Sequence, residues 1–108
     1  LHQVILNILN NSKDALVENR VRNAKIQIET KSDNNIGIIM IHDNAGGIPN
    51  DIIDRIFEPY YTTKEQGKGT GIGLYMSKTI ITNNMNGELK AYNKNDGACF
   101  EIRLNLVQ

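Results

Sequence analysis

Asparagine side chains repeat near the start of the chain at a spacing that could hold a metal ion. Asn7, Asn11, Asp14 and Glu18 would form one stripe if residues 1–19 are helical. Asparagine is a mediocre helix former, so two of them one turn apart need a reason. A solvated helix face is the plain interpretation. The other is that the amide oxygens of Asn7 and Asn11 bind Mg²⁺, a hard cation that is often shared with nucleotide phosphates.

A glycine-rich stretch lies further along the chain. Four glycines alternate with other residues in Gly67-Lys68-Gly69-Thr70-Gly71-Ile72-Gly73-Leu74, directly ahead of a helical pattern. Glycine lets a ligand approach the main chain, and the N–H groups at a helix start favour anions such as phosphate. The spacing matches neither of the two common phosphate-binding loops. On this stretch alone, a mobile linker and a phosphate-binding loop both stay open.

An acidic residue stands at the mouth of a predicted buried strand. Asp43 follows the apolar run 36–42 and precedes the sequence Asn-Ala-Gly-Gly. A carboxylate here can accept hydrogen bonds from an exocyclic amine, while the glycines leave room for a flat ring. The same residue types are common in turns, so a strand-ending turn is the other interpretation. His42 has no supporting group nearby in sequence and is interpreted as a strand residue.

The elements that must position these residues follow from apolar periodicity. It predicts helices over 1–19, 50–56 and 71–84, and strands over 25–31, 36–42, 88–93 and 98–106. Turn sequences at 32–35 and 94–97 join the strands in antiparallel pairs, and Gly87 is expected to end the last helix. The predicted fold is α+β, a two-layer α/β sandwich. Its mixed, mainly antiparallel sheet is covered on one face by helices, and its other face is polar.

The same periodicity predicts which side chains face the core. On the helices these are Leu1, Ile5, Ile8, Leu9, Ser12, Leu16, Ile52, Ile53, Ile56, Ile72, Tyr75, Met76, Thr79 and Ile80. On the strands they are Ile26, Ile28, Thr30, Ala98, Phe100, Ile102, Leu104 and Leu106, with Cys99 and Glu101 facing outward.

Composition excludes several classes of function. The 108 residues suffice for one domain, and the zero net charge argues against a nucleic-acid surface. No apolar run reaches the roughly 20 residues of a membrane helix, and the single Cys99 cannot form an internal disulfide. The chain opens without Met inside a helical pattern, so it is expected to be a fragment of a longer protein. We expect a cytoplasmic domain, with membrane anchoring of the complete protein left open.

Four stretches together resemble one family. Asn7-x-x-x-Asn11 resembles the N box of sensor histidine kinases, and 43–47 resembles the G1 box. Residues 57–64 resemble the F box, and 67–74 the G2 box, all in the family order. The whole chain, residues 1–108, therefore resembles a single catalytic ATP-binding domain of a two-component sensor histidine kinase. Such domains have the Bergerat fold, which they share with DNA gyrase B, MutL and a heat-shock chaperone family.

The resemblance implies roles for individual residues. Asn7 and Asn11 would be the catalytic pair that holds Mg²⁺ and phosphate oxygens, and Asp43 would bind the adenine amine of ATP. The implied nucleotide contacts extend to Asp14, Gly47, Ile48, Tyr61, Thr62, Thr63, Lys64, Lys68, Gly69, Thr70, Gly71, Gly73 and Leu74. Residues 57–68 would form a lid. Four positions depart from the family pattern. Ala45 replaces the usual first glycine of the G1 box, and Asp14 replaces a frequent basic residue. Ala98 replaces a common small hydroxyl residue, and Asn105 replaces the proline that often ends the final strand.

The resemblance also implies a function and partners. In the complete protein, expected to be a homodimer, the γ-phosphate would pass to a histidine of a separate dimerisation and histidine-phosphotransfer domain, then to a response regulator. Neither His2 nor His42 has the context of that histidine, and the isolated domain is expected to be a monomer. Gyrase-like ATPases usually place a glutamate base where Asn7 stands. The absence of that glutamate favours phosphoryl transfer to a protein over hydrolysis of ATP. A Bergerat-fold ATPase clamp and a nucleotide-gated regulatory binding module remain alternatives.

Overall fold

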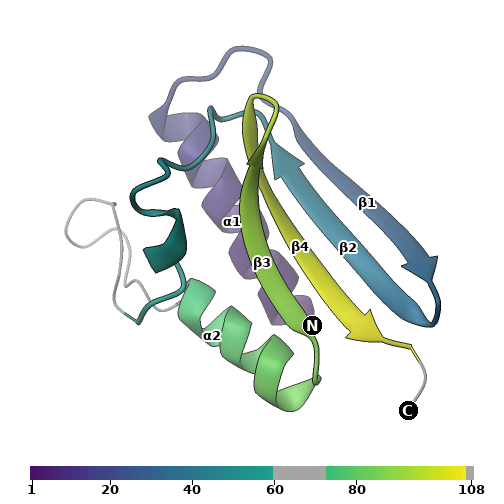
Figure 1. Ribbon diagram of the computed structural model, residues 1–108. Helices are drawn as coiled ribbons and strands as arrows, with labels where there is room; N and C mark the ends of the chain where they lie inside the picture. The colour runs from purple at the N-terminus through teal and green to yellow at the C-terminus, as the bar shows by residue number, and fades with distance from the viewer. Residues whose placement is uncertain (60–72, 107–108) are drawn as a thin grey trace.

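Two helices pack against one face of a four-stranded sheet (Figure 1). The computed structural model describes residues 1–59 and 73–106. Its elements are α1 (His2–Glu18), β1 (Ile26–Asp33), β2 (Ile36–Asp43), the 3₁₀ turn η1 (Ile53–Arg55), α2 (Gly73–Thr79), the π-helical turn η2 (Ile80–Asn84), β3 (Glu88–Lys94) and β4 (Gly97–Asn105). This arrangement confirms the predicted α+β sandwich. No helix in these ranges is long and apolar enough to cross a membrane.

The sheet has the order β1-β2-β4-β3, and each neighbouring pair of strands is antiparallel. Two hairpins build it, and both turns contain asparagines in the left-handed region. Asn34 and Asn35 have φ of 50° and 67°, and Asn95 has φ of 54°. Asparagine tolerates this conformation, which two-residue hairpin turns demand. The predicted turns at 32–35 and 94–97 are therefore confirmed, and β2 and β4 become the central strands.

The core lies between the sheet and the helices. Val4, Ile8 and Leu16 recur at multiples of four residues along α1, so they form one buried stripe. Val4 and Ile8 belong to one core cluster with Ile41 and Phe100 of the sheet, which are 0% and 1% exposed. Burial of each such side chain contributes about 1.5–3 kcal/mol, so this stripe decides how α1 lies on the sheet.

Several predicted inward positions are wrong. Leu1, Ile28 and Leu106 are 41%, 53% and 59% exposed. Ile28 lies on the edge strand β1, whose side chains from Gln27 onward are all exposed. The helices contact β2 and β3, so the edge at β1 extends beyond their cover. An alternating pattern alone cannot distinguish an edge strand from a covered one.

The second helix also presents a different face from the one predicted. Tyr75 and Met76 are 38% and 44% exposed, whereas Ser77 and Ile81 are fully buried. In this orientation Ile81 enters the core and Ser77 accepts a hydrogen bond from Asn7 of α1.

Two further local predictions need correction. The segment predicted as a helix over 50–56 makes only the single turn η1, since so short an isolated helix gains too few hydrogen bonds to offset its nucleation. Asn86, with φ of 54°, takes the left-handed position expected of Gly87. At Gly87 a Cβ would overlap the carbonyl oxygen of Arg103, so close packing against β4 explains that glycine.

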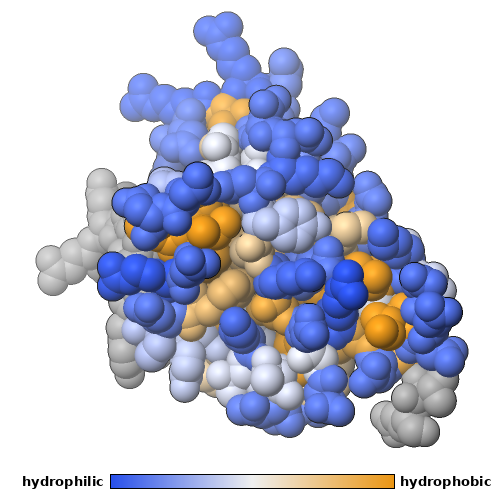
Figure 2. Space-filling view, viewed as in Figure 1, coloured by the Kyte–Doolittle hydropathy of each residue, from blue (hydrophilic) through white to orange (hydrophobic). Residues whose placement is uncertain are grey.

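The sheet face away from the helices is mostly hydrophilic, with hydrophobic areas between the polar side chains (Figure 2). Cys99 and Glu101 face outward as predicted, yet they are only 1% and 7% exposed. The Tyr92 hydroxyl lies across both, 3.5 Å from the Cys99 sulfur and 3.0 Å from Glu101 Oε1. Long neighbouring side chains thus bury the middle of a face that none of the described helices covers.

Candidate functional site

The candidate site begins at Asp43, the last residue of β2. Its carboxylate is 4% exposed, and Oδ1 accepts hydrogen bonds from the backbone N–H of Ala45 at 3.0 Å and of Ala98 at 3.3 Å. Oδ2 has no hydrogen-bond partner among residues 1–59 and 73–106. One oxygen therefore fixes the carboxylate, and the other is available to a ligand that donates a hydrogen bond.

Gly97 makes this position of Asp43 possible. A Cβ at Gly97 would overlap the Asp43 backbone carbonyl and would lie 2.8 Å from Oδ1. The sequence explained Gly97 as part of a hairpin turn. The structure adds that β4 starts there because only glycine lets the hairpin approach the end of β2 so closely.

The loop after Asp43 is held at its start by asparagine side chains. Asn44 accepts a hydrogen bond from Lys25 N at 2.9 Å and donates one to Asn23 O at 3.0 Å. Asn19, at the end of α1, donates to Ala45 O at 2.8 Å. These contacts tie the loop to α1 and to the entry of β1.

The glycines of the same loop take backbone angles that other residues avoid. Gly46 and Gly47 have φ of 97° and 89°. The Gly46 N–H donates to Asp96 O at 2.7 Å, which joins the loop to the β3–β4 turn. The next residue, Ile48, exchanges two hydrogen bonds with the side chain of Asn93 on β3, each 2.7 Å long. Sequence reasoning missed Asn93, although an asparagine within a predicted strand is unusual enough to be a signal.

Asn7 joins α1 to the first turn of α2. Its Nδ2 donates to Gly73 O at 3.3 Å and to Ser77 Oγ at 3.1 Å, while its Oδ1 accepts from Gln3 Nε2 at 3.0 Å. Ser77 Oγ also donates to Gly73 O at 2.8 Å. A Cβ at Gly73 would meet only Asn7 Cγ, at an ordinary 3.8 Å. Packing within the described residues therefore does not require glycine at this position.

The remaining polar residues of the α1 stripe lie between these two ends. Asn11 and Asp14 are half-buried, one and two turns beyond Asn7. From Asn7 to Asn19 the helix advances about 18 Å. The candidate site thus extends along α1, from Gly73 at one end to the loop at 44–48 at the other.

Phe57 anchors the start of the segment that resembles the F box. Its ring meets that of Phe100 edge to face, with centroids 6.3 Å apart, and Lys78 Nζ lies 4.8 Å from its centroid. These contacts hold Phe57 against the core and against α2. Leu74 lies half-buried against the core. Eight predicted nucleotide-binding residues lie outside the described ranges: Tyr61, Thr62, Thr63, Lys64, Lys68, Gly69, Thr70 and Gly71.

Ser12 is a polar residue of α1 whose side chain is buried. Its hydroxyl is buried, with no hydrogen-bond partner within the described part of the chain, although Ser12 itself lies on the predicted core face. A buried hydroxyl without a partner costs about 1–3 kcal/mol.

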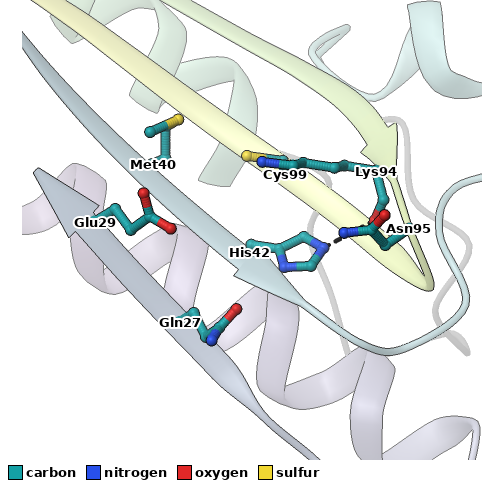
Figure 3. Close-up of a pocket in the computed structure, with 7 residues that line it drawn as sticks. All are labelled: Gln27, Glu29, Met40, His42, Lys94, Asn95 and Cys99. Atoms are coloured by element: carbon teal, nitrogen blue, oxygen red, sulfur yellow. Dashed lines mark hydrogen bonds between the residues drawn. The ribbon is translucent and has the colours of Figure 1, made fainter.

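A separate hollow of about 190 Å³ lies on the opposite face of the sheet (Figure 3). His42, Lys94 and Cys99 line it, and His42 Nε2 lies 2.9 Å from Lys94 O. Across the described ranges, no group of three His, Cys, Asp or Glu side chains could hold a metal. The hollow is remote from Asp43 Oδ2, since His42 and Asp43 project to opposite faces of β2. Its residues have no part in the candidate site.

Comparison with known proteins gives a consistent result. A family model described as histidine kinase-, DNA gyrase B- and HSP90-like ATPase matches residues 1–108. The two-component sensor PprA of Pseudomonas aeruginosa is 43% identical over 99% of this chain, which spans 12% of that protein. Sporulation kinase D of Bacillus subtilis is 37% identical over 75% of this chain, and the match covers 15% of the kinase.

A solved structure agrees with these relatives. The nucleotide-free catalytic domain of the histidine kinase ThkA superposes with a TM-score of 0.78 at 25% identity. The match covers 95% of this chain and 64% of that one. The chain therefore corresponds to one part of much longer relatives.

Proposed function

Because the chain belongs to the family of histidine kinase-, DNA gyrase B- and HSP90-like ATPases, and within it to the catalytic domains of sensor histidine kinases, we propose that it binds Mg-ATP along α1. In the complete protein it would donate the γ-phosphate to a histidine of a separate helical domain.

The geometry of Asp43 is the observation that carries this proposal. Its Oδ1 is held by two backbone N–H groups, so the carboxylate has a fixed orientation at the end of β2. A fixed, buried carboxylate oxygen suits the exocyclic amine of adenine, which donates a hydrogen bond. Guanine has a carbonyl at that place, which would repel the carboxylate. The site therefore favours ATP over GTP.

The phosphates would lie at the other end of α1. Asn7 and Asn11 offer amide oxygens, which are hard ligands of the kind Mg²⁺ takes, so the residues present fit the metal. When bound, Mg²⁺ would neutralise phosphate charge. Asn7 Oδ1 already accepts a hydrogen bond from Gln3 Nε2, so one of its two lone pairs would be left for the metal while that contact lasts. Asn11 is the simpler candidate. Glycine at position 73, which packing does not require, would let phosphate approach the start of α2.

The residues of this domain would supply positioning rather than covalent chemistry. Phosphoryl transfer depends largely on alignment and charge neutralisation. No carboxylate stands at position 7 to deprotonate water, so transfer to a protein acceptor is favoured over hydrolysis. The acceptor histidine would belong to a dimerisation domain of the same protein, and a response regulator would receive the phosphate from it. We propose a cytoplasmic location for the domain and a homodimer for the complete protein.

Transfer of a radioactive label tests the function. The domain would be incubated with ATP labelled at the γ-phosphate, Mg²⁺ and the separate helical domain of the parent protein. We expect acid-labile, base-stable label on a histidine of the helical domain. The variant Asn11→Ala should lose this transfer and should bind ATP more weakly only when Mg²⁺ is present.

Two results would contradict the kinase proposal. The first is ATP binding without label on histidine. The second is steady phosphate release by the isolated domain at a rate that the acceptor does not change, which would favour an ATPase clamp.

A further inference from the structure

We propose that Asn93 is a positioning residue for the adenine end of the site, an inference that rests on the proposed function. Asn93 would not touch the nucleotide. It would hold the loop at 44–48 at a fixed distance from Asp43, so that the pocket has its shape before ATP enters.

The contacts of Asn93 are unusually complete for a side chain. Its Nδ2 donates to Ile48 O and its Oδ1 accepts from Ile48 N, both at 2.7 Å. A weaker contact joins Nδ2 to Asn50 Oδ1 at 3.4 Å. Engagement of both backbone groups of one residue is the arrangement found between paired strand residues. The carboxamide thus takes the place of a fifth strand beside β3.

The loop needs such a partner because its own sequence fixes it weakly. Gly46 and Gly47 have no side chains to pack, and glycine loses more backbone entropy on ordering than any other residue. Asn44 and Asn19 hold the start of the loop, and Asp96 O holds its middle. Only the contacts of Asn93 hold its end at Ile48, among the hydrogen bonds of the described residues.

Asn93 is also connected, through Ala98, to the carboxylate that would bind adenine. Asn93 on β3 is paired with Ala98 on β4, and the Ala98 N–H donates to Asp43 Oδ1. The row Asn93, Ala98 and Asp43 therefore crosses three strands and joins the loop wall to the base-binding carboxylate. Backbone hydrogen bonds of the sheet keep this row rigid.

Gly47 supports the same conclusion. A Cβ at Gly47 would lie 2.8 Å from Asn93 Oδ1, closer than real Cβ contacts. A side chain there would push the carboxamide away from Ile48. The glycine that the sequence assigned to ring clearance thus also lets Asn93 reach the loop.

The test compares Asn93→Ala and Asn93→Asp with the control Lys94→Ala. Lys94 is the next residue on β3, and its side chain lies in the hollow on the opposite face. Asn93→Asp keeps the size of the side chain and the acceptor for Ile48 N, but it loses the donor for Ile48 O. If Asn93→Ala does not fold, Asn93→Asp alone tests the role of the side chain. ATP affinity would be measured by titration calorimetry, with Mg²⁺ and with a chelator, alongside thermal unfolding and the amide proton shift of Ile48.

We expect both Asn93 variants to bind ATP about tenfold more weakly, equivalent to about 1.4 kcal/mol. The loss should be equal with and without Mg²⁺, because it arises at the base and not at the phosphates. The Ile48 amide proton should move upfield in Asn93→Ala, which removes its acceptor, but not in Asn93→Asp, which keeps it. The ATP affinity of Lys94→Ala should stay within twofold of wild type. A merely structural residue would lower the unfolding temperature without changing the affinity of the folded protein.

Two results would overturn the inference, and they differ. If wild type binds ATP and both Asn93 variants bind it equally well, the role of Asn93 is wrong while the proposed function stands. If wild type itself does not bind ATP, the proposed function fails and this inference fails with it.

Discussion

Asp43→Asn changes the chemistry of the adenine end with almost no change of shape. The carbonyl oxygen of the new asparagine can keep both contacts of Oδ1, to Ala45 N and Ala98 N. Its Nδ2 then takes the place of Oδ2 and presents a donor where the carboxylate presented an acceptor. The fold should survive, since the two buried N–H groups stay paired.

The size of the effect follows from the contacts. ATP would lose a hydrogen bond to a charged acceptor, worth about 1.5–3 kcal/mol, and would face an opposed donor, with a penalty of about 1–3 kcal/mol. A combined loss of at least about 2.5 kcal/mol corresponds to a decrease of at least roughly seventyfold in affinity. GTP should gain, because Nδ2 can donate to the guanine carbonyl. The preference for ATP over GTP should therefore shrink or reverse.

Calorimetric titration of wild type and Asp43→Asn with ATP and with GTP measures both the ATP affinity and the preference for ATP over GTP. Asp43→Ala serves as the contrasting variant, since it leaves the Ala45 and Ala98 N–H groups without Oδ1 and should lower the unfolding free energy by about 2–4 kcal/mol. Urea unfolding checks this difference. The reasoning is refuted if Asp43→Asn binds ATP within threefold of wild type, or if its affinities for ATP and GTP fall by the same factor.

Three further substitutions test the supporting structure. Gly97→Ala should cost at least about 3 kcal/mol in chemical unfolding and weaken ATP binding, because its Cβ would overlap the Asp43 carbonyl; wild-type stability would contradict this packing. Ser12→Ala should raise the unfolding free energy by about 1 kcal/mol, because it removes a buried hydroxyl without a hydrogen-bond partner among the described residues. A lower unfolding free energy would contradict this and would show that the hydroxyl has a hydrogen-bond partner. Glu101→Gln should lower the free energy of unfolding by about 1–3 kcal/mol at neutral pH. Burial raises the pKa of Glu101, but hydrogen bonds from Arg103 and Tyr92 and the charge of Lys90 outweigh it and lower the pKa. This stabilisation is present above the pKa of Glu101 in the unfolded state and is lost as the pH falls through its lowered pKa in the native state. The unfolding free energies of wild type and Glu101→Gln, measured with urea, should therefore become equal in acid. A difference that persists in acid would contradict the assignment.

Local patterns in the sequence predicted most of the fold. Turn residues located both hairpins, and the apolar run at 36–42 indicated a central strand, which β2 is. Asp43 is predicted as a site residue because an acid stands at the mouth of such a strand, ahead of two glycines, although the same residue types also suit a turn. The four boxes then connected Asn7, Asn11 and Asp43 in one family, although no single box would have been enough.

The remaining features depend on contacts between distant residues. Ile28 is exposed because β2 pairs with β4 on its other side, which leaves β1 at the edge, and periodicity carries no information on strand order. Asn93 meets Ile48 across 45 positions of the chain. The reason for Gly97 appears only when the ends of β2 and β4 lie together. Ser77 is not among the predicted core positions, and its burial follows from packing against α1, where Asn7 contacts it.

A nuclear magnetic resonance titration of the isotope-labelled chain with Mg-ATP tests the location of the site most directly. We predict that the backbone amides of Ala45, Ile48 and Ala98, which surround Asp43, shift as ATP is added. The amides of Gln27 and Glu29, at the hollow on the other face, should stay unchanged. Shifts confined to that hollow, or no shift around Asp43 at high ATP concentration, would contradict the claim that this end of the sheet binds the base.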